Sequence, residues 1–96
     1  MKDIYVIVHE DEVKAEHDFK IALSIRAYRE IQEIKGIYQY RNIDNDPTKI
    51  PEDLPSANEC RIHVCGSSLA NCIPKQIAAL EKAGYKATIS RSASIY

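Results

Sequence analysis

The chain has 96 residues, of which 45% are apolar and 28% are charged, and its formal net charge is −1. A chain this short buries one continuous apolar core, so we expect a single compact domain over residues 1–96. The balanced charge gives no broad positive field, which argues against nucleic acid and membrane surfaces as partners. No apolar run reaches the length of a signal or membrane-spanning segment, so we expect a cytoplasmic protein.

Three cysteines, Cys60, Cys65 and Cys72, occur in a chain without a secretory signal pattern. An odd number in that setting predicts reduced thiols and no disulfide framework. His63 adds a further possible zinc ligand, but no paired CxxC is present, and Cys60 and His63 would face opposite sides of a strand. We therefore expect no metal site and no cofactor.

The first half of the sequence predicts a strand, a long helix and a second strand. Residues 3–9 are a β-branched, nearly continuous apolar run, typical of a strand that is covered on both faces. From about Asp11 to Lys35 the chain lacks proline and glycine, and apolar residues recur at helical spacing. This pattern predicts one long helix that begins at Asp11 or at Asp18, either of which can cap it, and ends near Gly36 in a left-handed cap. The Tyr- and Ile-rich segment 37–43 predicts the second strand.

The second half predicts a long loop, a strand and another helix. Prolines at three positions make residues 44–58 an irregular surface connection. Residues 60–65 predict the third strand. Pro74 is tolerated only in the first turn of a helix, so the second helix begins at about residues 71–73, and Gly84 ends it.

A fourth strand is predicted over residues 86–90, which completes the order βαβ, long loop, βαβ. This order predicts a small three-layer open α/β sheet, mostly parallel, with about four strands in the spatial order 2-1-3-4 and two main helices, one on each face. The carboxyl ends of the first and third strands then become neighbours, which brings residues 9–11 close to residues 66–72. Because one helix per face leaves part of the sheet uncovered, we expect a homodimer or higher homo-oligomer.

Cys72 is the residue that the sequence marks most clearly as a candidate for chemical reactivity. It falls in the first turn of the predicted second helix, after a Gly-Ser-Ser bend, where unpaired amides and the helix dipole favour a thiolate. The same amides are suitably placed oxyanion donors. Two alternatives stay open: Cys72 is a small buried apolar residue, or the turn binds a phosphate or carboxylate without a covalent step.

Segments 64–73 and 79–85 resemble the signature of the isochorismatase-like cysteine hydrolases, a superfamily that includes nicotinamidases and N-carbamoylsarcosine amidases. In that signature a strand ends in glycine, the nucleophilic cysteine comes six residues later, and Gly-Tyr closes the helix twelve residues beyond the cysteine. Gly66, Cys72 and the pair Gly84-Tyr85 match these spacings.

The resemblance covers about residues 59–96, including the pair Ala93-Ser94, which is similar to an Ala-Ser pair at the family's next strand. The resemblance implies a Rossmann-like α/β fold and hydrolysis of a small amide. It also implies an aspartate and a lysine as partners of the cysteine, but these positions correspond here to about His9 and Arg41. Arg41 stays protonated and cannot relay a proton, although it can hold a carboxylate or an oxyanion.

Three interpretations follow from these residues. The first is a divergent cysteine hydrolase of a small amide, with Cys72 as the nucleophile and His9 as the general base, oriented by one of the acidic residues 10–12. The second is a non-catalytic ligand-binding or interaction module that keeps the fold without the family's aspartate and lysine. A third, simpler interpretation is a structural protein whose exposed sheet face only pairs with a partner protein. The candidate ligand-binding residues are Arg41, Gly66, Ser67, Ser68 and Asp11.

Overall fold

The computed structural model describes residues 1–96 and contains four strands and three helices. The strands are β1 (Lys2–Val8), β2 (Gln39–Ile43), β3 (Cys60–Ser67) and β4 (Ala87–Ile95). The helices are α1 (Glu10–Asp18), α2 (Ala22–Ile37) and α3 (Cys72–Lys82). All neighbouring strands are parallel, and their order is β2-β1-β3-β4. This confirms the small parallel α/β fold that the sequence predicts.

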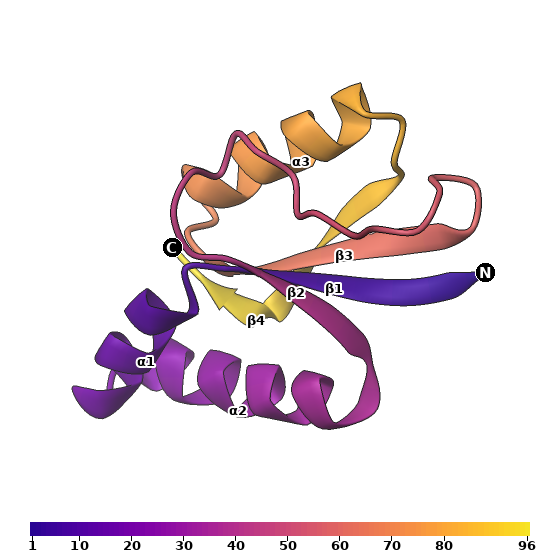
Figure 1. Cartoon of the computed structure of the whole chain (residues 1–96). Coiled ribbons are helices and arrows are strands. Elements are labelled where there is room, and N and C mark those ends of the chain that lie inside the picture. The colour runs from indigo at the N-terminus through magenta and orange to yellow at the C-terminus, as the bar shows by residue number, and fades with distance from the viewer.

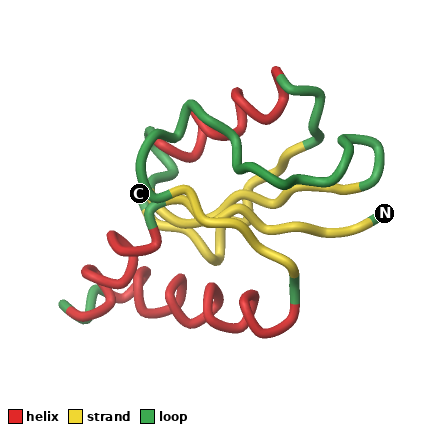
Figure 2. The backbone as a smooth tube through the Cα atoms, in the orientation of Figure 1, coloured by secondary structure: helices red, strands yellow, loops and turns green.

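The sheet is the middle of three layers. Helix α3 and the loop between β2 and β3 lie on one face, and α1 and α2 lie on the other (Figure 1). The same loop runs across the face that α3 covers, and it has no regular structure (Figure 2). Because every strand runs in one direction, all four carboxyl ends lie at the same edge of the sheet, where the C-terminus also lies.

Side chains that alternate along the strands fill two separate cores. The core between the sheet and α3 is made by Ile4, Val6, Val8, Ile43, Cys60, Ile62, Val64, Ile73 and Leu80. The core between the sheet and the other two helices is made by Ile7, Val13, Ala27, Ile31, Ile34, Cys65, Ala93 and Ile95. Strand β1 contributes to both cores, which explains why its sequence is almost continuously apolar.

The long helix predicted between Asp11 and Lys35 is two helices, so the expectation of two main helices is corrected to three. Lys20 has a left-handed conformation, with φ 59°. Its amide donates to His17 O at 2.9 Å, and the amide of Ile21 donates to Glu16 O at 3.2 Å. This is the Schellman arrangement that ends a helix, and it usually contains glycine rather than lysine.

Several predicted boundaries also change, and the second strand begins at Gln39 instead of residue 37. Gly36 lies inside α2, which continues to Ile37, so it is not a left-handed cap. Strand β3 extends to Ser67, two residues beyond the prediction. Strand β4 extends to Ile95, because the chain bulges between Ile89, which pairs with Val64, and Ser94, which pairs with Gly66. A bulge hides the continuing strand from a prediction based on alternation.

The loop of residues 44–59 covers much of the sheet that we expected to be bare. Ile50 and Leu54 pack against the core beneath α3. The loop is fixed to the rest of the protein by buried Gln76, which donates to Pro47 O and Lys49 O. Coverage by this loop removes the packing argument for a second copy on that face. None of the helices combines the length and the apolar character that crossing a membrane needs.

Candidate functional site

The carboxyl ends of β2, β1 and β3 meet in register. Val8 of β1 pairs with Ile43 of β2 and with Gly66 of β3. Gly66 has φ 109°, and a Cβ atom on it would lie 2.1 Å from the carbonyl oxygen of Val8. Only glycine permits this approach, so Gly66 brings β3 and the following turn against the end of β1. The predicted proximity of residues 9–11 and 66–72 rests on this contact.

Cys72 is the first residue of α3 and is partly exposed. The turn before it is tightly folded: the amide of Ile73 donates to Ser68 O at 2.9 Å, and the amide of Leu69 donates to Ile95 O at 2.8 Å. The peptide bond between Ser67 and Ser68 is cis. The backbone hydrogen bonds of the turn do not use the amides of Ser68 or Cys72 as donors. Cys72 therefore has the placement predicted from Pro74, with unpaired amides beside it.

The other two cysteines are buried on opposite faces of β3. Burial raises the pKa of the Cys65 thiol to about 12. Burial, and then the neighbouring carboxylate of Glu59, also raises the pKa of the Cys60 thiol above its usual value. Both thiols are thus held in the unreactive protonated form, and Cys72 is the cysteine that solvent reaches.

His9 lies directly after β1 in a left-handed conformation, with φ 49° and ψ 55°. Its side chain is 14% exposed. The ring nitrogen Nε2 is 2.9 Å from the carbonyl oxygen of Asn45, and the other nitrogen, Nδ1, is 3.1 Å from Oε2 of Glu12. Nδ1 is buried and has no aligned hydrogen-bond partner. Neither nitrogen makes a hydrogen bond to Cys72, so the predicted pair of Cys72 and His9 is not joined in this structure.

Glu12 links His9 to the end of β3. Its Oε1 accepts a hydrogen bond from the hydroxyl of Ser67 at 3.1 Å, while its Oε2 faces the His9 ring. Ser67 itself is 2% exposed. Of the three acidic residues at the start of α1, Glu12 is the one beside His9. Asp11, which we expected near the ligand, is exposed and makes no ion pair or side-chain hydrogen bond.

Arg41 makes different contacts from those expected of a ligand-binding residue. Its guanidinium donates to the carbonyl oxygen of Tyr40 at 3.0 Å and to that of Asp53 at 3.1 Å. It therefore ties the edge strand β2 to the long loop, which protects an otherwise open strand edge. None of its hydrogen bonds reaches the turn between Gly66 and Cys72.

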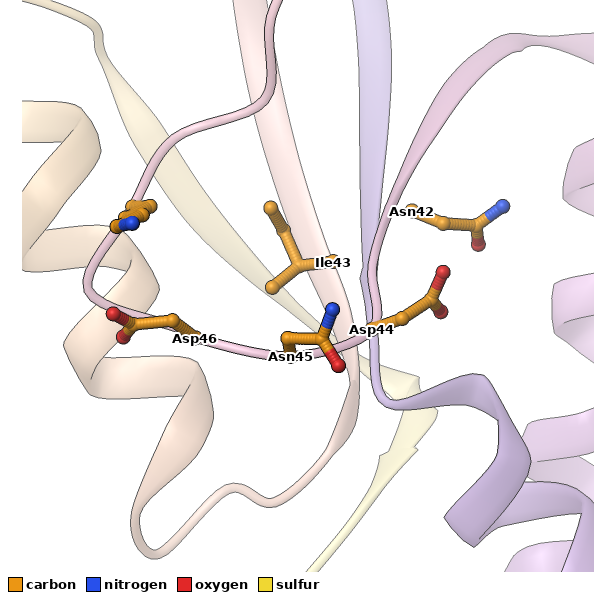
Figure 3. Close-up of a pocket in the computed structure, with 6 residues that line it drawn as sticks. Asn42, Ile43, Asp44, Asn45 and Asp46 are labelled. Carbon is orange, nitrogen blue, oxygen red and sulfur yellow. The ribbon is translucent and has the colours of Figure 1, made fainter.

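A hollow of about 350 Å³ lies where the chain leaves β2. It is lined by Asn42, Ile43, Asp44, Asn45, Asp46 and Lys49. Figure 3 shows these side chains following one another as the chain leaves the sheet and turns toward α3. Two hydrogen bonds from Thr48, donated by its hydroxyl and its amide, lower the pKa of the Asp46 carboxyl. The hollow is thus rich in oxygen acceptors. The ring of His9 contacts the backbone carbonyl of Asn45, one of the residues that line it.

A second hollow, of about 310 Å³, lies between Thr48 and the outer side of α3 and is lined by Lys75, Ala78, Ala79 and Lys82. Neither hollow is lined by Cys72, His9 or Arg41. No group of three or more His, Cys, Asp or Glu side chains is arranged to hold a metal ion.

Sequence reasoning did not select Asn42, Asp44, Asn45 and Asp46 as site residues. By sequence, residues 44–46 belong to the irregular surface connection after the second strand. The available signal was positional: polar residues directly after a parallel strand lie at the edge where α/β proteins bind ligands.

Comparison with known proteins gave no relative. The chain matches no protein-family model, no curated protein and no solved structure.

Proposed function

We propose that the protein is a non-catalytic small-molecule-binding module, whose ligand occupies the hollow at the carboxyl end of β2. The observation that carries this proposal is the hollow itself, about 350 Å³ in volume and lined mainly by carboxylate and amide side chains. Its volume falls in the range of small-molecule sites, and its position is the edge where open α/β sheets bind ligands.

The lining favours a particular ligand chemistry. Asn42, Asp44 and Asn45 present oxygen acceptors, and Lys49 is the only positively charged lining group. A ligand with several hydroxyl, amine or amidine donors would pair with these oxygens, because amide and carboxylate oxygens accept hydrogen bonds from such groups. An anionic ligand would meet two carboxylates, so this proposal replaces the expectation of an anion held by Arg41.

Two-dimensional NMR of the labelled protein tests the proposal with a panel of polyols, amino sugars and polyamines. We expect ligand-induced shifts at residues 42–46, and Asp44→Asn should weaken binding roughly 10-fold or more, since it removes a charged hydrogen-bond partner. Arg91→Ala, which changes an exposed charge outside the hollow, is the matched control and should leave the affinity unchanged. Shifts centred on the turn at Cys72, with residues 42–46 unaffected, would contradict it.

Catalysis by Cys72 is the second candidate, because this thiol is partly exposed at the start of α3 beside unpaired amides. The resemblance to isochorismatase-like hydrolases suggests a small amide as substrate. Against it, His9 is directed to Asn45 and Glu12. A hydrolase must therefore reorient His9 or use a different base.

Alkylation with iodoacetamide at neutral pH tests the second candidate. A reactive thiolate should make Cys72 react at least about 10-fold faster than Cys60 and Cys65, as read by peptide mass spectrometry. Release of ammonia from a panel of small amides, abolished by Cys72→Ala, would establish catalysis. If no amide is hydrolysed and the labelling of Cys72 is as slow as that of a free thiol peptide, the hydrolase candidate fails.

A further inference from the structure

Four groups lie in contact one after another across the carboxyl edge of the sheet, and the contact between His9 and Glu12 is an ion-pair distance without hydrogen-bond alignment. The carbonyl oxygen of Asn45 contacts Nε2 of His9 at 2.9 Å, and Nδ1 of His9 contacts Oε2 of Glu12 at 3.1 Å. Oε1 of Glu12 then accepts the hydroxyl proton of Ser67 at 3.1 Å. This chain joins the wall of the hollow to the strand that precedes Cys72, through groups supplied by the β2–β3 loop, the end of β1, α1 and β3.

The groups that contact the His9 ring determine which of its nitrogens carry a proton. A carbonyl oxygen only accepts, so Nε2 of His9 must carry a proton and donate it to Asn45. In a neutral imidazole the other nitrogen, Nδ1, would then present a lone pair to a carboxylate oxygen 3.1 Å away, which is repulsive. The contact is attractive only when one more proton lies between His9 and Glu12, most simply as an imidazolium beside a carboxylate.

No other charged side chain forms an ion pair with His9, although several lie on the elements around it. On α1, the carboxylate of Glu10 is 2.7 Å from the ammonium of Lys35, so it is already neutralised. On the loop, the carboxylates of Asp44 and Asp46 flank Asn45 in the sequence, and neither forms an ion pair with His9. β3 contributes the neutral hydroxyl of Ser67. The ion pairs of His9 include no group other than Glu12.

We propose that His9 and Glu12 form a proton-dependent latch between the wall of the hollow and the end of β3. With the extra proton, the latch holds Asn45 and Ser67 in the positions of this structure. When the proton is lost as the pH rises, the His9 ring and the Glu12 carboxylate separate, and the left-handed backbone of His9 loses one of the side-chain contacts that compensate for its strain. Any effect on ligand affinity rests on the proposed function, but the latch itself belongs to the ligand-free protein.

NMR of the ligand-free protein between pH 5 and pH 9 tests the latch. Long-range nitrogen–proton spectra of the imidazole rings should show His9 with Nε2 protonated throughout and with Nδ1 losing its proton during the titration. The backbone amide signals of Asn45 and Ser67 should shift with the same midpoint as the His9 ring. His63, which pairs with Asp3 at the other end of the sheet, is the internal control, and its titration should leave both amides unmoved.

Two variants separate the parts of the latch. In Glu12→Gln the side-chain amide can donate to Nδ1 while its oxygen still accepts from Ser67, so the contacts persist without the extra proton. The amides of residues 45 and 67 should then show no transition at the His9 midpoint. In Ser67→Ala, Asn45 should continue to follow the His9 ring, while residue 67 should no longer do so.

The latch is overturned by any of three results: Asn45 and Ser67 do not follow His9 in the natural sequence, Glu12→Gln retains the transition, or the spectra place the proton of neutral His9 on Nδ1. None of these measurements contains a ligand. An intact latch in a protein that binds nothing would therefore reject the proposed function alone.

Discussion

At the scale of single residues, the site depends on backbone conformations that few side chains tolerate. Gly66 lies against the carbonyl group of Val8 at the point where β1 and β3 end. His9, directly after the end of β1, has a positive φ. These two residues place the first turn of α1 and the turn before α3 beside each other, so the geometry of the carboxyl edge is fixed by backbone approach before any side chain contributes.

Replacement of Gly66 by alanine should be strongly destabilising. The new Cβ would lie 2.1 Å from Val8 O, and alanine is strained at φ 109°. We expect a loss on the order of 3 kcal/mol or more in the free energy of unfolding, measured by urea denaturation. Gly36→Ala is the control: nothing lies within 4 Å of its added Cβ inside α2. It should instead stabilise the protein by roughly 0.5–1 kcal/mol. Equal effects from both variants would refute the close-approach explanation.

At the scale of elements, the predicted long helix is divided at a point where the sequence has no glycine to mark the end of a helix. Helices that end in a left-handed residue usually place glycine there, but this chain has Lys20. Apolar residues continue at helical spacing across the break, and Phe19 remains 83% exposed. The two helices are held together by tertiary contacts instead, such as the Glu10 to Lys35 ion pair at 2.7 Å.

Lys20→Gly should stabilise the protein, because glycine adopts the left-handed conformation without the penalty that a side chain carries. We expect a gain of about 0.5–1 kcal/mol in the free energy of unfolding, since the lost penalty is partly offset by the greater freedom of glycine in the unfolded chain. Arg29→Gly, at an exposed helical position of α2, should cost about 1 kcal/mol and serves as the matched control. Thermal and urea denaturation measure both. A loss of stability in Lys20→Gly would contradict the assigned conformation.

At the scale of the whole molecule, titratable groups set the pH range of stability. Hydrogen bonds from His63 to Asp3, from His17 to Asp18 and from Thr48 to Asp46 lower the pKa of all three carboxyls. Burial raises the pKa values of Cys60, Cys65 and Tyr5, with smaller contributions from neighbouring charges. The first group favours folding when ionised, and the second favours folding when protonated.

The free energy of unfolding should therefore be greatest at pH values between the titration range of the carboxyls and that of the thiols. The contribution of the carboxyls is present above the unfolded pKa of 3.8 and is lost as the pH falls through the lower folded values. The contribution of the thiols is present below the unfolded pKa of 9.0 and is lost as the pH rises toward about 12, the folded value of Cys65.

Urea denaturation across the pH range measures how the free energy of unfolding falls at acid pH (the acid limb) and at alkaline pH (the alkaline limb). Asp3→Asn should reduce the steepness of the acid limb, and Cys65→Ala should reduce that of the alkaline limb. An acid limb unchanged in Asp3→Asn would show that this carboxyl has the same affinity for protons in the folded and unfolded protein.

Local patterns, together with the order of the elements, were sufficient to predict the parallel α/β fold, the strand order 2-1-3-4 and the start of α3. Nearly continuous apolar runs identify strands that are covered on both faces, and Pro74 limits where a helix can begin. The position of Cys72 at a helix start, beside the end of the first strand, follows from these features alone. The signals for each element are short-range, carried by residues within that element, and the strand order follows from the sequence of elements joined by right-handed crossovers.

Only the tertiary structure decided which side chains meet at the carboxyl edge. Sequence reasoning assigned His9 to Cys72 and Arg41 to a ligand, but Asn45 and Glu12 surround His9, and backbone carbonyls hold Arg41. The reason is that a side chain at a strand end can turn toward several neighbours. The choice among them is made by donors and acceptors that residues distant in the chain bring to the same place.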